Sequence, residues 1–214
     1  DAKRRAIDPE TGKSVLIDNM TYQEWAAWKK AENQTAWETF IKKGKNASAD
    51  RNQYEKYKGV LKGKAGKNLE EFTDIKYNNI EKWNFLKLDY ARRSKLINHP
   101  EMALPNADKA MAPEGKFTKY LFDPESKKGW PKGRAIISRL GYSADNWEQM
   151  QAEILRGAKL YPSNKVGKNE YGDLYEQRMV LYGKKDTPAN VIVGWIVKED
   201  GSVSMTTAYI KEVK

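Results

Sequence analysis

The stretch NVIVGWIVKEDGSVSMTTAYIK, residues 190–211, decides the fold. It contains two segments rich in β-branched and aromatic residues, 190–198 and 203–211, which are joined by Glu199-Asp200-Gly201. An Asp-Gly pair between two such segments is a strong signal for a β-hairpin. Both faces of the first segment are apolar, so we expect a central strand that is covered on both sides. Gly194 in that strand would let another group approach the backbone closely.

The side chains of the second segment divide between two faces, because successive residues of a strand point in opposite directions. Strict alternation gives one face Thr206, Ala208 and Ile210, and the other face Met205, Thr207, Tyr209 and Lys211. The first set is typical of a core. The second set is predicted to form a working surface.

The residues before the hairpin predict further elements of the same domain. We expect a third strand over 174–182, preceded by a polar, glycine-containing loop from Pro162 to Gly172. A short helix is expected from Lys132 to Leu140, and Asp145, three residues before Glu148, is predicted to cap a second helix. The buried stripe of that second helix would consist of Trp147, Met150, Ile154, Leu155 and Ala158.

The first hundred residues are expected to be mainly helical. A turn signal precedes the apolar run Val15-Leu16-Ile17, and Thr21 lies three residues before Glu24, as in a capping box. Aromatic and aliphatic residues then recur at helical spacing from about 50 to 97, with a glycine-marked break near 63–68. Core packing, rather than stacking on bases, is the expected role of these aromatic residues.

Proline residues at 100 and 105 separate these helices from the helix-then-strand pattern that follows. The chain is therefore predicted to comprise a segment over 1–33, a helical connector over 34–103 and a small domain over 104–214. The expected fold class is α+β, with an N-terminal helical segment followed by helices packed on an antiparallel sheet.

Composition limits the chemistry that this chain can perform. The 39 Lys and Arg residues outnumber the 29 Asp and Glu residues, and the net charge of +10 favours a polyanionic partner. The absence of cysteine excludes disulfides, thiolate zinc sites and a cysteine nucleophile. One histidine is too few for a metal nuclease of the histidine-rich type, so we expect neither a metal nor another cofactor. The sequence has no apolar run long enough for membrane insertion.

Two parts of the chain resemble segments of known phage and toxin proteins. Residues 8–25, with Asp8-Pro9-Glu10-Thr11-Gly12-Lys13 and Asn19–Trp25, look like the tail of the head-morphogenesis module in Mu-type phage minor head proteins of Firmicute prophages. Residues 104–214 resemble a toxin-like domain at the C-terminus of such proteins and of other polymorphic toxins. The matching stretches are Leu104–Ala110, Lys116–Leu121, Ser138–Tyr142, Tyr175–Gln177, Ala189–Trp195 and Met205–Tyr209.

This resemblance implies a domain of the barnase/RelE-like ribonuclease group, with helices on a sheet of about four antiparallel strands. It implies a prophage-encoded toxin that acts on cellular RNA, for example tRNA. Cleavage without a metal ion is expected from the residues themselves, since the sequence has no Cys, one His and no convincing carboxylate cluster. The expected partners are RNA and, through the missing N-terminal module, phage head proteins. A small acidic immunity protein is also expected, because a cell that makes a nuclease needs protection and a basic groove favours an acidic protein. The implied locations are the bacterial cytoplasm or the phage particle, with action in the cytoplasm of the target cell.

The site residues are inferred from what RNA cleavage without a metal requires, namely a base for the 2′-hydroxyl, stabilisation of the phosphorane and an acid for the 5′-oxygen. Tyr209 and Thr207 are the first candidates, although a pair that only packs is the competing interpretation. Lys132 and Arg134 lie at a helix start, where backbone N–H groups also favour anions. The further candidates are Lys116 and Glu176 for catalysis, and Arg178, Thr206, Lys211 and Trp195 for substrate binding.

Three other functions compete with this interpretation. An ADP-ribosyltransferase would show a Gln/Glu-x-Glu turn, but both Gln-x-Glu tripeptides of the sequence, at 53–55 and 151–153, lie in segments expected to be helical. A DNase toxin remains an alternative, because Glu212-Val213-Lys214 fits half of a restriction-type metal site. A non-enzymatic phage segment, whose basic helices bind DNA or capsid partners, is the third alternative.

Overall fold

The computed structural model describes residues 42–213 together with residues 5–7, 14–16, 21, 23, 24, 26, 27, 30 and 34. The chain divides into two compact units, 1–54 and 55–214. In the first unit, β1 (Arg5–Ile7) and β2 (Ser14–Leu16) pair antiparallel. The expected capping box is confirmed, because the backbone N–H of Glu24 donates to Thr21 Oγ1 at 3.2 Å and that of Thr21 donates to Glu24 Oε2 at 2.8 Å. Ile17 lies outside the described residues.

The helical region contains α2 (Ala47–Leu61), a 3₁₀ turn η2 (Lys62–Ala65), α3 (Leu69–Asn78) and α4 (Ile80–Asn98). The break predicted near 63–68 is therefore confirmed. Asn68 begins α3 and Asn79 begins α4, and each side chain accepts a hydrogen bond from a backbone N–H three residues later. The aromatic rings pack together as a core, with Tyr57 stacked on both Trp83 and Tyr90.

The second unit contains a four-stranded antiparallel meander, β3 (Ser163–Asn169), β4 (Gly172–Leu181), β5 (Ala189–Val197) and β6 (Val203–Ile210). The α+β fold class and the three predicted strands are confirmed. The loop predicted for Pro162 to Gly172 is wrong, because most of it forms the edge strand β3. Only Ser163 of β3 is buried, so this strand lacks the apolar alternation by which strands are identified.

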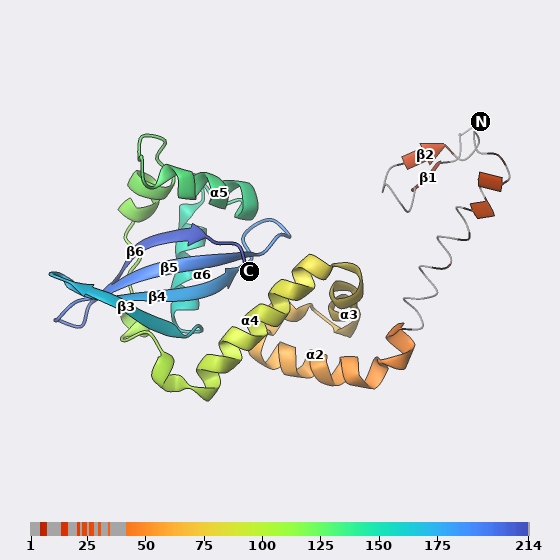
Figure 1. Cartoon of the computed structure of the whole chain (residues 1–214), viewed down its shortest axis with the longest axis horizontal. Coiled ribbons are helices and arrows are strands. Elements are labelled where there is room, and N and C mark those ends of the chain that lie inside the picture. Colours follow the sequence, from red (N-terminus) through yellow and green to blue (C-terminus); the bar gives the residue numbers. More distant parts are fainter. Residues whose placement is uncertain are drawn as a thin grey trace. The chain divides into compact units, whose positions relative to one another are not determined.

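Two helices complete the sheet domain, α5 (Trp130–Leu140) and α6 (Trp147–Ala158). Figure 1 shows α6 behind the sheet and α5 alongside β6, on which it packs. The predicted stripe of α6 is confirmed, since its residues are buried in the core or packed against it. The predicted cap is wrong: Asn146, not Asp145, precedes the helix, and its side chain accepts from the backbone N–H of Ser143 at 2.7 Å.

A β-bulge in β6 changes the faces that alternation predicted. Gly194 lies opposite Thr207 and Trp195 lies opposite Met205, so Thr206 is the extra residue. Met205 is consequently buried in the core, and its predicted place on the working surface is wrong. Beyond the bulge the prediction holds, because Ala208 is buried in the core. The opposite face of the sheet, which we call the outer face, carries Thr207 and Tyr209.

Helix α4 is joined to the sheet domain by a buried polar network. Asp89 of α4 is fully buried, and it accepts hydrogen bonds from the hydroxyls of Tyr161 and Tyr182, each at 2.5 Å. The guanidinium of Arg93 donates to the same carboxylate at 2.8 Å. These three partners of the carboxylate lie within the unit 55–214, so α4 packs as part of the sheet domain. The division of the chain at residue 104 stays a prediction.

Candidate active site

Lys132, near the start of α5, lies at the centre of a cluster of polar and aromatic side chains. Its Nζ donates to the hydroxyl of Tyr120 and to Thr207 Oγ1, both at 2.9 Å. The same ammonium lies 5.4 Å from the ring centroid of Tyr120 and 5.5 Å from that of Tyr209. Lys116 Nζ lies 5.8 Å from the Tyr120 ring. We call these five residues the Lys132 cluster.

Close backbone packing places Tyr120 beside Lys132. Tyr120 belongs to a π-helical turn, η5 (Phe117–Leu121), a rare conformation that is frequent at functional sites. A Cβ atom at Gly133 would lie 1.6 Å from the carbonyl oxygen of Leu121, and one at Gly129 would lie 1.9 Å from that of Tyr120. The two glycines therefore let the start of α5 contact the π turn backbone to backbone. This contact brings the Tyr120 hydroxyl within reach of Lys132.

The electrostatic surroundings favour the ionised form of Tyr120. Burial alone would raise the pKa of Tyr120, but hydrogen bonds with Lys132 and Thr207 and the charges of Lys132 and Lys116 outweigh burial and lower this pKa below its ordinary value. Tyr120 is half-buried, so part of the residue is accessible to solvent. Its surroundings also favour the phenolate over the neutral hydroxyl. A tyrosine with these properties can take a proton from a bound substrate.

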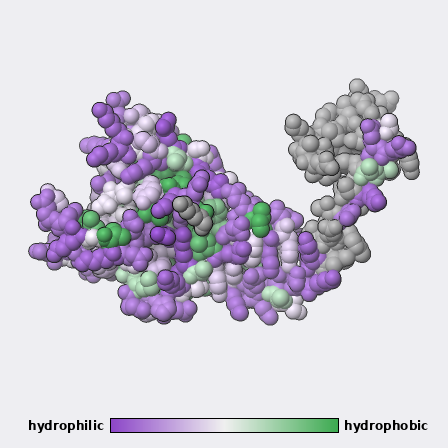
Figure 2. Space-filling view, viewed as in Figure 1, coloured by the Kyte–Doolittle hydropathy of each residue, from purple (hydrophilic) through white to green (hydrophobic). Residues whose placement is uncertain are grey.

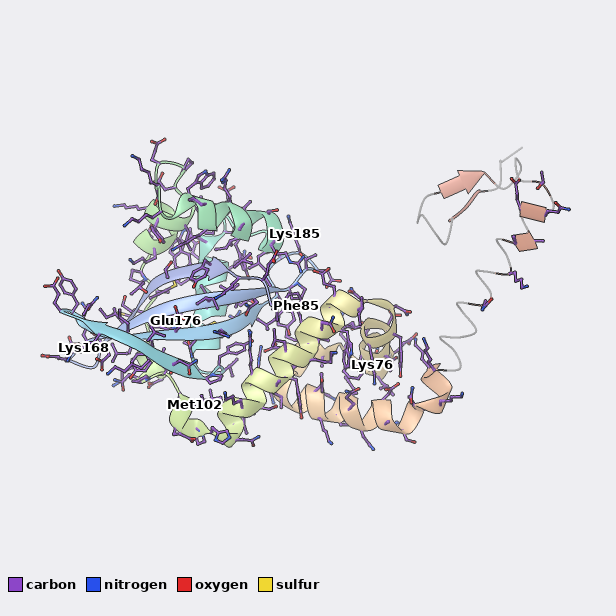
Figure 3. All side chains as sticks on the ribbon, viewed as in Figure 1. Lys76, Phe85, Met102, Lys168, Glu176 and Lys185 are labelled. Atoms are coloured by element: carbon purple, nitrogen blue, oxygen red, sulfur yellow. The ribbon has the colours of Figure 1, made fainter. Side chains whose placement is uncertain are left out.

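The outer face continues from the Lys132 cluster onto the neighbouring strands. Thr207 pairs with Gly194, which pairs with Glu176, so these three residues form one row across the sheet. At about 4.8 Å between strands, the Cα atoms of Glu176 and Thr207 lie roughly 10 Å apart, with only a glycine between them. Figure 3 labels Glu176 on the sheet. The side chains of Thr206 and Thr207 pack closely beside this glycine, since a Cβ at Gly194 would lie 2.7 Å from Thr206 Oγ1 and 3.2 Å from Thr207 Cγ2.

The next row of the outer face consists of Arg178, Ile192 and Tyr209. Arg178 is exposed, and it is separated from Tyr209 by Ile192. Burial first, and then the nearby charge of Arg178, lower the pKa of Arg92, a residue of α4 whose guanidinium donates to Asn190 Oδ1 at 2.7 Å. The charges of Arg178 and Arg92 therefore add positive potential on this side of the outer face, which favours an anion.

Four of the residues predicted from the sequence fall in the Lys132 cluster: Lys116, Lys132, Thr207 and Tyr209. Glu176 and Arg178 share the outer face but lie on β4, which β5 separates from β6. Thr206 is half-buried at the bulge, and Lys211 is exposed just beyond the end of β6.

Two predicted site residues lie elsewhere. Arg134 is exposed and lies two residues after Lys132, a rotation of about 200° around the helix, so it points away from the cluster. Trp195 was expected to bind substrate, but it is fully buried in the core, where its Nε1 donates to Gln177 Oε1 at 2.9 Å. Its place among the substrate-binding residues is corrected, because β5 is buried on both faces from Ala189 to Trp195.

Tyr120 is the residue of the cluster that sequence reasoning missed. It lies in Lys116–Leu121, a stretch quoted for the toxin resemblance, but nothing local distinguishes it from a packing tyrosine. The signal for its position is the pair of glycines at 129 and 133, which becomes informative only when their contact with the π turn is known.

The described part of the chain offers no obvious metal site and no membrane span. Among these residues, no group of three or more His, Asp or Glu side chains could hold a metal ion. Glu212 is exposed, and Lys214 of the Glu212-Val213-Lys214 motif lies outside the described residues. The helices that the structure describes are all too short or too polar to cross a bilayer.

Comparison with known proteins identifies a family. The chain belongs to the family described as a domain of unknown function, DUF6883, whose model matches residues 103–212. Among solved structures, it is similar to one described as a contact-dependent growth inhibition toxin–immunity protein complex from Klebsiella pneumoniae 342. The two chains are 17% identical, the match covers 50% of this chain and 97% of the other, and the TM-score is 0.39. No curated protein matches the sequence.

Proposed function

We propose that this chain is the toxin portion of a prophage-encoded polymorphic toxin and that its Lys132 cluster cleaves RNA without a metal ion. The observation that carries the chemistry is the hydroxyl of the half-buried Tyr120, which lies 2.9 Å from Lys132 Nζ in a chain with a net charge of +10. The toxin role rests on the resemblance of residues 104–214 to polymorphic toxin domains.

The proposed reaction is an internal transesterification of RNA. Tyr120, as the phenolate, takes the proton of a 2′-hydroxyl, and the 2′-oxygen forms a bond to the adjacent phosphorus. Lys132 and Lys116 stabilise the added negative charge of the phosphorane. The bond from phosphorus to the 5′-oxygen then breaks, and Tyr209 donates a proton to that oxygen. The products are a 2′,3′-cyclic phosphate and a free 5′-hydroxyl.

The proposed substrate is cellular RNA, tRNA being one candidate, in the cytoplasm of a target cell. The net charge of +10 and the cations of the outer face support a polyanionic substrate. The same charge supports a small acidic immunity protein that covers the face bearing Tyr209, since an acidic protein can imitate the polyanion. Attachment to phage head proteins through an N-terminal module completes the proposal.

A cleavage assay tests this function. Expression of residues 1–214 under tight repression is expected to fragment total RNA and to leave DNA intact. The purified chain should cleave RNA in EDTA and leave 2′,3′-cyclic phosphate ends. Replacement of Tyr120 by Phe or of Lys132 by Ala should lower the rate on the order of 10²-fold. As a control, His99→Ala alters an exposed residue paired with Glu101 and should leave the rate unchanged.

Two results would overturn the proposal. Activity that EDTA abolishes and magnesium restores would favour the DNase alternative. Full toxicity in a combined Tyr120, Lys132 and Thr207 variant that remains folded would show that this cluster does not cause the toxicity. It would favour a non-enzymatic role.

A further inference from the structure

A second feature of the domain is a large cleft between α4, α5 and the ends of β5 and β6. Its volume is about 1010 Å³, at the upper end of the range for ligand pockets. Figure 2 shows apolar surface around the C-terminal end of β6, on a face that is otherwise mostly hydrophilic. The apolar residues that line the cleft include Phe85, Leu88, Ala135, Ile210 and Val213.

The cleft begins where the Lys132 cluster ends. Ala135 lies three residues after Lys132, so the two side chains are neighbours on α5. Lys211 lies two residues after Tyr209 and therefore follows it on the same side of the chain. A molecule whose reacting group lies at Lys132 can extend directly into the cleft.

The walls of the cleft combine an aromatic face with cations. Phe85 is half-exposed, and the guanidinium of Arg139 lies 5.7 Å from its ring centroid. Arg139 is also bound to the carboxylate of Glu81 at 2.5 Å and to the carbonyl of Pro188 at 2.7 Å, so it holds α4 beside α5. Lys87 and Lys211 are exposed and line the same cleft. Figure 3 labels Phe85 where α4 comes close to the ends of β5 and β6.

This combination matches the chemistry of an unpaired nucleotide. A base that is released from its stack gains most from a flat aromatic or guanidinium surface, and its phosphate gains from nearby cations. A base within a duplex would first have to unstack and unpair, which costs a few kcal/mol. The cleft therefore suits single-stranded RNA, or a loop, better than a continuous double helix.

We infer that this cleft binds an unpaired nucleotide that adjoins the scissile phosphate, with its base against Phe85 and its phosphate close to Lys87 and Lys211. The inference rests on the proposed function, because it takes RNA as the substrate of the Lys132 cluster. It adds a preference for single-stranded RNA and a site for a neighbouring nucleotide.

Binding of a probe that cannot be cleaved tests the cleft apart from the reaction. The probe is a fluorescein-labelled, single-stranded 2′-O-methyl RNA, which lacks the attacking hydroxyl, and fluorescence anisotropy gives the dissociation constant. Phe85→Ala should weaken binding about 5- to 150-fold, the range for losing one stacked base. Phe85→Trp should restore binding, which separates stacking from damage to the fold.

Matched controls come from the opposite end of the sheet. Tyr171 is an exposed aromatic residue in the β3–β4 turn, and Tyr171→Ala should leave probe binding unchanged. Lys211→Ala should weaken binding more than Lys168→Ala, since Lys168 lies on β3, far from the cleft (Figure 3). A duplex of the same sequence should bind more weakly than the single strand.

The results distinguish the two proposals. If Phe85→Ala binds the probe as tightly as the parent chain, or if the duplex binds as tightly as the single strand, the cleft proposal is wrong, even if the chain cleaves RNA. If probe binding depends on Phe85 but the parent chain cleaves no RNA, the cleft proposal stands and the proposed function fails.

Discussion

Tyr120 depends on Lys132 for its chemistry, and this dependence has a measurable pH signature. Because the ammonium stabilises the phenolate, removal of Lys132 should raise the pKa of Tyr120 toward its ordinary value. A rate that requires the phenolate increases with pH up to this pKa. We therefore expect the rising limb of the pH–rate profile to move to higher pH in Lys132→Met, and to disappear in Tyr120→Phe.

The measurement is the initial rate of RNA cleavage from pH 5 to 10 for the parent chain and both variants. Lys119→Met is a suitable control, because Lys119 is exposed on the same π turn and is not part of the Lys132 cluster. A rising limb in Lys132→Met at the same pH as in the parent chain would show that Lys132 does not set the pKa of the base.

At the scale of secondary-structure elements, the contact between α5 and the π turn is a site where a single methyl group should matter. In Gly133→Ala the new Cβ would lie 1.6 Å from a backbone oxygen, so one element must move. Overpacking of this kind typically costs about 1–3 kcal/mol. We expect lower stability in urea unfolding and, at concentrations of urea where the variant is still folded, slower cleavage because Tyr120 is displaced from Lys132.

Gly115→Ala is the matched control for this variant. Gly115 lies just before the π turn, and a Cβ there would meet no atom within 4 Å. It should leave both stability and rate close to those of the parent chain. Equal rates in Gly133→Ala and the parent chain would mean that the position of the π turn does not control the reaction.

The same elements show what sequence patterns can and cannot predict. Sequence pattern identified α5, α6 and three strands because each of them buries at least one apolar face. It missed β3, because neither face of this strand lies in the core. It also missed the bulge at Thr206, because the sequence pattern does not indicate where a strand contains an extra residue. Four residues of the site could be predicted from the chemistry of phosphate cleavage. Tyr120 could not, because its position depends on Gly133, in a different element.

At the scale of the whole unit 55–214, the network around Asp89 predicts how stability changes at alkaline pH. Burial and the charge of Asp89 raise the pKa values of Tyr161 and Tyr182 above their ordinary value, so both hydroxyls stay protonated in the folded chain. In the unfolded chain they ionise near pH 10. The stabilisation is therefore fully present below about pH 10 and is lost as the pH rises further.

Urea unfolding at pH 8 and at pH 11 tests this expectation. The free energy of unfolding of the parent chain should fall between the two values, and the fall should be smaller in Tyr182→Phe, which has one titrating hydroxyl fewer. Tyr171→Phe changes an exposed tyrosine, so its free energy of unfolding should fall as much as that of the parent chain. An equal fall in all three chains would contradict the proposed role of the network.

The edge strand β3 has a consequence for how copies of the protein behave toward one another. An uncovered edge is a template on which a second chain can add a strand, and β3 forms one edge of the sheet. It carries Lys165 and Lys168, and its pairing with β4 is irregular at Val166. Lys165 is paired with Asp173 at 3.0 Å, but two copies that met along β3 would still bring two Lys168 ammonium groups onto one short ladder, which opposes self-association. This edge therefore helps to keep the protein soluble when it is made in quantity.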